Sequence, residues 1–185
     1  VRSPHALGCD PDGTVVQGLR LYFPRVLYLP LSRGSQNAWL YAASIRAPLA
    51  RRCAEFKPGF LWSSFLFPDG VGVGRLAERL RLPHVVTVVG SDLNANISNP
   101  ARLRAIRACV EGASLVLAKS RALRETLLSV GGQPSKIMVD YNGVDTRTFH
   151  PRPRALACAE LGASPAPRRI LFVGSLRPVK NVPVL

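Results

Sequence analysis

The sequence is poor in the residues that build metal centres and disulfide frameworks. Its four cysteines contain no CxxC pair and stand at Cys9, Cys53, Cys109 and Cys158. Its three histidines form no recognisable metal set and stand at His5, His84 and His150. A structural zinc site and a disulfide scaffold are therefore both unexpected, and free thiols suit a reducing cytosol.

Long hydrophobic runs are also missing, which argues against a membrane-spanning helix. A spanning helix needs roughly 18 consecutive apolar residues. The nearest match is LYFPRVLYLPL at 21–31, which Pro24, Arg25 and Pro30 interrupt. We predict an extended, partly buried segment there. No charged start followed by an apolar stretch marks a signal peptide, and the chain opens without Met in the middle of a pattern, so we expect both ends to be cut.

Acidic residues are scarce, because 11 Asp and Glu stand against 25 Lys and Arg, for a formal net charge of +14. On a predicted helix, an apolar stripe (Leu103, Ile106, Val110) lies opposite a basic face (Arg102, Arg104, Arg107). Such a face attracts nucleic acid, anionic lipid or phosphorylated substrates, and it is equally typical of an ordinary solvated surface. Nucleic acid is the weakest of these readings, since no aromatic-rich strand or recognition helix supports it.

What the chain does have is a globular composition, 47% hydrophobic and 19% charged, with a regular alternation of helical and strand patterns. Helices are predicted at 35–53, 71–81, 99–111, 120–130 and 155–161. Strands are predicted at 60–67, 84–89, 114–118, 136–141 and 170–173, with a polar loop at 90–100. Alternating helices and short apolar strands indicate βαβ units, so we expect an α/β fold with a parallel sheet.

The stretch GVGRLA at 72–77 fits the dinucleotide fingerprint G-x-G-x-x-G/A, and Asp92 follows at the spacing of a ribose-binding acid. This leaves an NAD-dependent oxidoreductase as an alternative. Against it, Pro68, Asp69 and Gly70 separate the strand from the glycines, and Asp92 stands in a loop rather than at a strand end.

A set of segments in fixed order is more specific. It consists of FPDG (67–70), VVTVVGSDLN (85–94), LVLAKSRALRETLLSVG (115–131), KIMVDYNGVD (136–145) and LFVGSLRPVKN (171–181). This set resembles the retaining glycosyltransferases of GT-B fold called family 4, especially those that build bacterial surface polysaccharides. The resemblance covers almost the whole chain.

The resemblance implies two Rossmann-like domains that face a cleft. Residues 1–145 would form the acceptor-side domain without its first strand, and 146–185 a linker and the start of the donor domain. Most of that donor domain, with the family's paired glutamates, would be missing. The resemblance further implies a hexosyltransferase-type enzyme that moves a sugar from a nucleoside-diphosphate donor to a saccharide or lipid-linked acceptor, with retention and without metal or other cofactor.

Carried over residue by residue, the resemblance assigns the donor diphosphate to Gly174, Ser175, Arg177 and Lys180. Lys180 would stabilise the charge that grows on the leaving diphosphate. The acceptor or sugar cleft would contain Gly90, Ser91, Asp92, Asn94, Asp69 and Gly70. Asp92 is counted as catalytic together with Lys180, although it equally fits a loop cap. Asn142 and Gly143 are expected to form the hinge, where positive φ is tolerated.

The chain departs from the family pattern at two positions. Ser175 stands where most relatives carry an arginine, so one diphosphate contact would be neutral. Val89 stands where relatives often have His or Arg, so no proton or charge is offered there. We expect a cytoplasmic protein, peripheral on the inner face of the cytoplasmic membrane through its arginines, and we expect the chain alone to be inactive.

Overall fold

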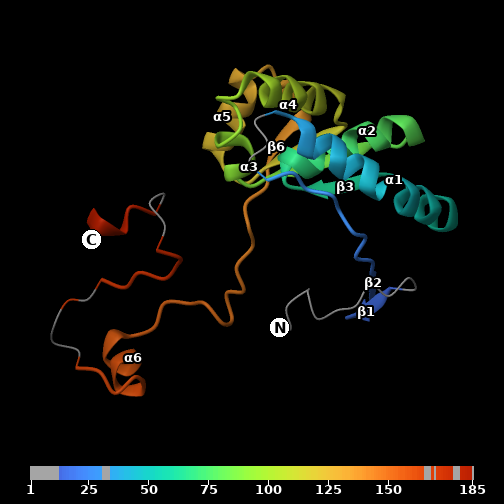
Figure 1. The fold of residues 1–185 in the computed structure, drawn as a ribbon. Helices are drawn as coiled ribbons and strands as arrows, with labels where there is room; N and C mark the ends of the chain where they lie inside the picture. Colours follow the sequence, from blue (N-terminus) through green and yellow to red (C-terminus); the bar gives the residue numbers. More distant parts are fainter. Residues whose placement is uncertain (1–12, 31–33, 165–167, 169, 177–179, 185) are drawn as a thin grey trace. The chain divides into compact units, whose positions relative to one another are not determined.

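The structure is a computed structural model, and it describes residues 13–30, 34–164, 168, 170–176 and 180–184. Contacts divide the chain into two compact units, Val1–Asn142 and Gly143–Leu185. Each unit is described by itself below (Figure 1).

The larger unit is built on a parallel sheet of four strands in the order β3-β4-β5-β6. The strands are β3 (Leu61–Ser64), β4 (His84–Val88), β5 (Leu115–Ala118) and β6 (Ile137–Val139). A separate antiparallel hairpin joins β1 (Thr14–Val16) to β2 (Leu19–Leu21). The parallel sheet confirms the α/β prediction, and the strands are rich in Val, Leu and Ile because both faces of such strands tend to be covered.

The helices of this unit are α1 (Gln36–Phe56), α2 (Val71–Leu80), α3 (Ser91–Asn94), α4 (Pro100–Gly112) and α5 (Arg121–Ser129). Parallel strands joined in sequence order take right-handed crossovers, so α2, α4 and α5 share one face of the sheet. Figure 1 shows α1 beside α2, against which it packs. On the opposite face, Trp62 and Met138 remain 63% and 52% exposed.

Local capping explains where two of these helices begin. The Asn99 side chain accepts hydrogen bonds from the backbone N–H groups of Ala101 and Arg102, and Pro100 takes the first helical position of α4. The Ser120 hydroxyl accepts from the N–H of Leu123 at the start of α5. Both predicted caps are confirmed, and Ser120 is therefore occupied as a cap.

The core lies between the sheet and the helix layer. Its fully buried members include Leu66, Val86, Leu93, Ile106 and Leu127. They come from π-helical turn η2 (Leu66–Gly70), β4, α3, α4 and α5, so the core joins every βα unit of the sheet. The loop predicted at 90–100 contains the short helix α3, whose Leu93 is drawn into this core.

The segment 22–30 runs along α1 without pairing as a strand, and we call it the strap. Asn37 of α1 accepts from the N–H of Leu29 at 2.8 Å and donates to the carbonyl of the same residue at 3.1 Å. The Ser44 hydroxyl accepts from the N–H of Leu27 at 3.0 Å. Leu27 and Tyr28 are both 67% exposed, so the segment is extended as predicted but less buried.

In the smaller unit the structure describes α6 (Arg154–Glu160) and a 3₁₀ turn at Val182–Val184. The strand predicted at 170–173 is wrong, because these residues pair with no described strand. Ile170 and Leu171 are 82% and 85% exposed. A strand is stabilised by hydrogen bonds to a neighbour, and a short apolar run without one stays irregular.

Candidate functional site

Asp92 joins the loops that follow β3 and β4 at the carboxyl edge of the sheet. Its carboxylate accepts from the N–H groups of Leu66 at 2.7 Å, Gly90 at 2.7 Å and Val89 at 3.2 Å. The side chain is buried. Of the two roles left open for Asp92, this geometry favours the loop cap, because the backbone already occupies both carboxylate oxygens. Any catalytic role of Asp92 stays a prediction.

We call the Asp92 carboxylate, together with the backbone N–H groups that it holds, the Asp92 brace. Asp69 lies in η2, beside this brace. It is half-buried, and burial raises the pKa of its carboxyl above the ordinary value, with the charge of Asp92 adding to the shift. Asp69 in turn helps to raise the pKa of Tyr41 on α1, although burial of the phenol is the larger cause. A carboxylate with a raised pKa accepts protons and hydrogen bonds more readily than an ordinary Asp.

Arg102 ties three further segments to the same edge. Its guanidinium donates to the Asn96 side chain at 2.9 Å and to the Gly34 carbonyl at 3.2 Å, and it lies 5.4 Å from the centre of the Phe67 ring. Asn96 is buried and donates to the Asp92 carbonyl at 3.0 Å. Arg102 was predicted on an outward basic face, either functional or simply solvated, but it holds the loop around Asp92 instead.

The brace leaves a small polar surface open. Ser91 and Asn94 are exposed on α3. Gly90 has φ +135°, and a Cβ built there would meet no atom of the described residues within 4 Å. Only glycine adopts this conformation readily, and the open space beside it lets a ligand approach the backbone closely. These three predicted cleft residues are thus brought together around Asp92. Val89 is 39% exposed beside them and offers no polar group.

Sequence reasoning missed an ion pair at the same edge. Lys119 and Asp140 directly follow β5 and β6, and Lys119 Nζ lies 2.6 Å from Asp140 Oδ2. Because ligands bind outside the carboxyl ends of parallel strands, the position of both residues directly after strands was the signal that could have found them.

Gly70 is buried, and a Cβ there would lie 2.8 Å from the Val86 side chain and 2.9 Å from the Phe65 carbonyl. It therefore permits packing and offers no surface to a sugar. The glycines of the supposed dinucleotide fingerprint are similar. Gly72 and Gly74 lie inside α2, against α1 and His84 respectively, and not in a loop before a helix. The oxidoreductase alternative loses its phosphate-binding turn and is not supported.

The predicted donor residues belong to the smaller unit. Gly174, Ser175 and Lys180 are exposed, whereas Arg177 lies outside the described residues. The units divide between Asn142 and Gly143, the two predicted hinge residues, yet neither has positive φ, so the conformational reason given for them is wrong.

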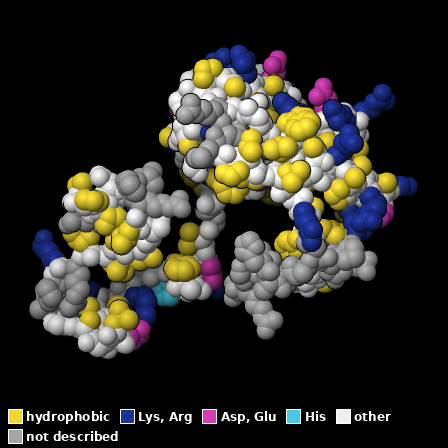
Figure 2. Space-filling model, viewed as in Figure 1, with side chains coloured by type: hydrophobic (Ala, Val, Ile, Leu, Met, Phe, Trp, Pro, Cys, Tyr) yellow, Lys and Arg dark blue, Asp and Glu magenta, His cyan; other side chains and the backbone are white. Residues whose placement is uncertain are grey.

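The predicted basic face of α4 is smaller than the sequence indicated. Arg107 donates to the Val130 carbonyl at 3.0 Å, and Arg102 is engaged as above. Figure 2 shows Lys and Arg side chains spread over the visible face of the larger unit rather than gathered into one patch.

Within the described residues, no three His, Cys, Asp or Glu side chains are placed to hold a metal ion. Burial raises the pKa of the Cys109 thiol to about 12, so it stays protonated. In the same part of the chain, no helix has both the length and the apolar composition that crossing a membrane requires.

Comparison with known proteins shows the family to which the chain belongs. The profile described as "Glycosyl transferase 4-like domain" matches residues 4–143. The "D-inositol 3-phosphate glycosyltransferase" of Mycolicibacterium gilvum is 32% identical over 151 residues, which are 75% of this chain and 34% of the relative. The protein of the same name from Kineococcus radiotolerans is 40% identical over 73 residues, 38% of this chain and 17% of the relative. The chain spans about a third or less of these relatives.

Among solved structures, Anabaena Alr3699/HepE in complex with UDP-glucose superposes with a TM-score of 0.51. The match covers 64% of this chain and 32% of HepE, at 21% identity. At that identity the match shows a common fold.

Proposed function

Since the chain belongs to the glycosyltransferase 4-like family, we propose that it forms the acceptor-side domain of an enzyme that uses a nucleoside-diphosphate sugar. The reaction would transfer a hexose to a saccharide or lipid-linked acceptor, with retention and without metal or other cofactor. The observation that carries the proposal is the Asp92 brace, which fixes Gly90, Ser91 and Asn94 at the carboxyl edge of the sheet, where α/β folds bind ligands.

Within this proposal the residues of the edge have separate roles. The Gly90 backbone permits close approach of the reacting sugar, and Ser91 and Asn94 hydrogen-bond hydroxyl groups. Asp69, with its raised pKa, accepts a hydrogen bond from the acceptor. Asp92 is a positioning residue that acts through the backbone groups it holds.

The donor diphosphate is assigned to Lys180, together with Gly174, Ser175 and Arg177, in a second domain that begins near Asp145. A fixed cation there would stabilise the charge that develops on the leaving diphosphate, more in the transition state than in the ground state. Because the described part of this unit is largely exposed, we expect the chain alone to bind nucleotide poorly and to have no transferase activity.

The test is radiolabelled sugar transfer from UDP- and GDP-sugars, with calorimetry of UDP and GDP, on this chain and on the longest protein that contains it. Lys180→Ala in the longer protein should lower kcat, and Asn94→Ala should raise the KM for the acceptor. Turnover by the chain alone, or tight nucleotide binding to it, would contradict the assignment of the donor site to the second domain.

Peripheral attachment to the inner face of the cytoplasmic membrane remains part of the proposal. Arg104, Arg107 and Arg121 are exposed on α4 and α5 and support it, and each would contribute about 1 kcal/mol near an anionic surface. Co-flotation of the protein with anionic liposomes should disappear in high salt. Flotation that ignores both salt and lipid charge would contradict it.

A further inference from the structure

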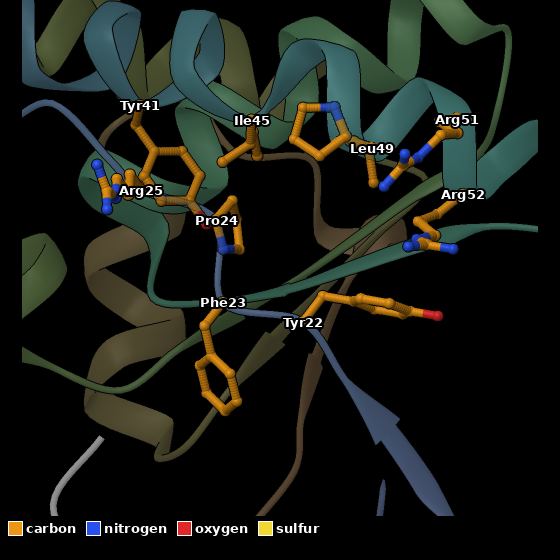
Figure 3. A pocket seen from close by; sticks show the side chains of 10 residues that line it. Tyr22, Phe23, Pro24, Arg25, Tyr41, Ile45, Leu49, Arg51 and Arg52 are labelled. Carbon is orange, nitrogen blue, oxygen red and sulfur yellow. The ribbon is translucent and has the colours of Figure 1, made fainter. Parts of the chain in front are cut away.

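A cavity of about 620 Å³ lies between the strap and α1 (Figure 3). Its walls are mainly apolar. Tyr41, Ile45 and Leu49 face it from α1, and Tyr22 and Pro24 face it from the strap. The volume lies in the range of pockets that bury a small ligand, which is roughly 300–1,000 Å³.

The cavity is part of the folded structure, because its two walls are fixed. The strap is bound to α1 by the hydrogen bonds of Asn37 and Ser44 described above. On the other wall, Ile45 is buried in a second apolar cluster with Ala42 and Leu76. The cavity therefore lies between two elements that are held in place, the strap and α1.

Arginines stand at both ends of this apolar space. Figure 3 shows Arg25 at the end near Tyr41, and Arg51 with Arg52 at the end near Tyr22. Arg52 contacts Glu55 at 2.7 Å and stacks on the Tyr22 ring at 3.9 Å. Within the described ranges, Arg25 and Arg51 have no ion-pair partner. An apolar cavity with the unpaired Arg51 beside the anchored Arg52 at one end complements a ligand that is apolar in its body and anionic at that end.

We propose that this cavity binds an amphiphile whose single apolar chain fills the space along Ile45 and Leu49 and whose phosphate lies at Arg51 and Arg52. Phosphate is the anion that guanidinium recognises best, through paired N–H donors. The anchoring of Arg52 on Tyr22 and Glu55 lowers the entropy cost of holding the group. The proposal stands independently of the proposed sugar transfer, since none of these residues belongs to the edge around Asp92.

The direct test is calorimetry of this chain with dodecyl phosphate below its micellar concentration, beside dodecanol and inorganic phosphate. Dodecyl phosphate should bind, and each half of the ligand alone should bind at least about tenfold more weakly. Equal affinity for dodecanol, or for a nucleotide such as UMP, would overturn the proposal.

Variants distinguish binding in the cavity from non-specific attraction of the ligand by the positive charge of the protein. Arg51→Gln should weaken dodecyl phosphate about tenfold, the worth of a hydrogen bond to a charged group. Leu49→Trp should fill the cavity and abolish binding, and Leu49 is only half-buried, so the fold should tolerate the change. Arg46→Gln, which removes an exposed arginine of the same helix α1 that does not line the cavity, is the matched control and should change nothing. An equal loss with Arg46→Gln would overturn the proposal, and circular dichroism of each variant checks its folding.

Two further probes distinguish the source of the ligand. Farnesyl phosphate presents a single prenyl chain in solution, whereas vesicles of phosphatidylglycerol present phosphate within a bilayer. Binding of either one that depends on both Arg51 and Leu49 supports the site and identifies its class. Binding of neither would overturn it.

Discussion

A buried polar side chain lies at the start of β4, His84, and another lies in α3 just after the strand ends, Asp92. The two differ in how many of their hydrogen-bonding atoms have partners. At the carboxyl end, the Asp92 oxygens accept from three backbone N–H groups. At the amino end, His84 Nε2 lies 2.8 Å from the Ser63 hydroxyl, but its Nδ1 has no hydrogen-bond partner among the residues that the structure describes. A satisfied network positions the backbone around it, whereas an unpaired buried atom costs free energy.

The comparison separates a buried polar side chain whose hydrogen bonds are satisfied from one that is left partly unpaired. Beside Nδ1, a second cavity of about 590 Å³ opens between α2 and α4, lined partly by Gly74 and Cys109. Burial lowers the pKa of His84 to about 4, so the imidazole is neutral there. The unpaired Nδ1 of His84 therefore costs free energy of folding, whereas the hydrogen-bonded Asp92 carboxylate does not.

The largest expected effect is at the satisfied end. Asp92→Ala would leave buried N–H groups of Leu66 and Gly90 without acceptors, at about 4 kcal/mol of unfolding free energy in total. Urea denaturation measures it. Asn94→Ala, an exposed change on the same short helix, is the control and should cost under about 0.5 kcal/mol. Equal stability of the two variants would mean that Asp92 is not a brace, and would restore it as a free catalytic carboxylate.

At the other end, we expect a pH dependence of stability. The unfolded chain protonates His84 below its ordinary pKa of 6.5, whereas the folded chain does so only below about 4. Stability is therefore full above pH 6.5 and falls as the pH drops toward 4, by about 3 kcal/mol from this group. Denaturation of the wild type and of His84→Gln at several pH values measures the difference. The same slope in both would show that His84 is not its source.

Alanine substitutions at two glycines of α2 should change the free energy of unfolding by a smaller amount. A Cβ at Gly72 would lie 2.8 Å from the Tyr41 ring and 3.0 Å from the Ala38 carbonyl, so Gly72→Ala should cost about 2 kcal/mol. At Gly74 the nearest atom is His84 Nδ1 at 3.2 Å, and the gain in helix propensity of about 1 kcal/mol should offset that contact. Thermal unfolding of Gly72→Ala and Gly74→Ala, beside the wild type, measures both effects. A strongly destabilising Gly74→Ala would mean that the space beside Nδ1 is needed.

The smallest effect concerns the ion pair at the carboxyl edge. The Lys119 and Asp140 side chains are 21% and 41% exposed, so Lys119→Met should cost only about 0.5 kcal/mol, and less in high salt. Urea denaturation at two salt concentrations measures it. A cost as large as that of Asp92→Ala would mean that the whole edge, and not the brace alone, fixes these loops.

The sequence predicted what local chemistry decides. Asn99 and Ser120 cap helices through bonds that reach only two or three residues along the chain, so their residue types were enough to place α4 and α5. The parallel sheet followed from the alternation of helix and strand patterns, and the family profile matches the same region.

What the sequence did not predict depends on distant partners. Arg102 looked solvated by helical periodicity, but its acceptor Gly34 lies 68 positions away along the chain. The Asp92 brace likewise depends on Leu66, 26 positions away. Gly72 and Gly74 matched a phosphate-binding pattern whose real meaning is helix packing, and the run at 170–173 has no described strand beside it.

The order of the strands in the sheet is their order in the chain, β3-β4-β5-β6. Each strand therefore pairs with the one made just before it, and each crossover helix can pack as soon as its own strand has joined. Such an arrangement closes one crossover at a time and needs no late insertion between the described strands that are already paired. During synthesis on the ribosome, this unit can consequently assemble by successive addition at one growing edge, with β6 as the last strand to join.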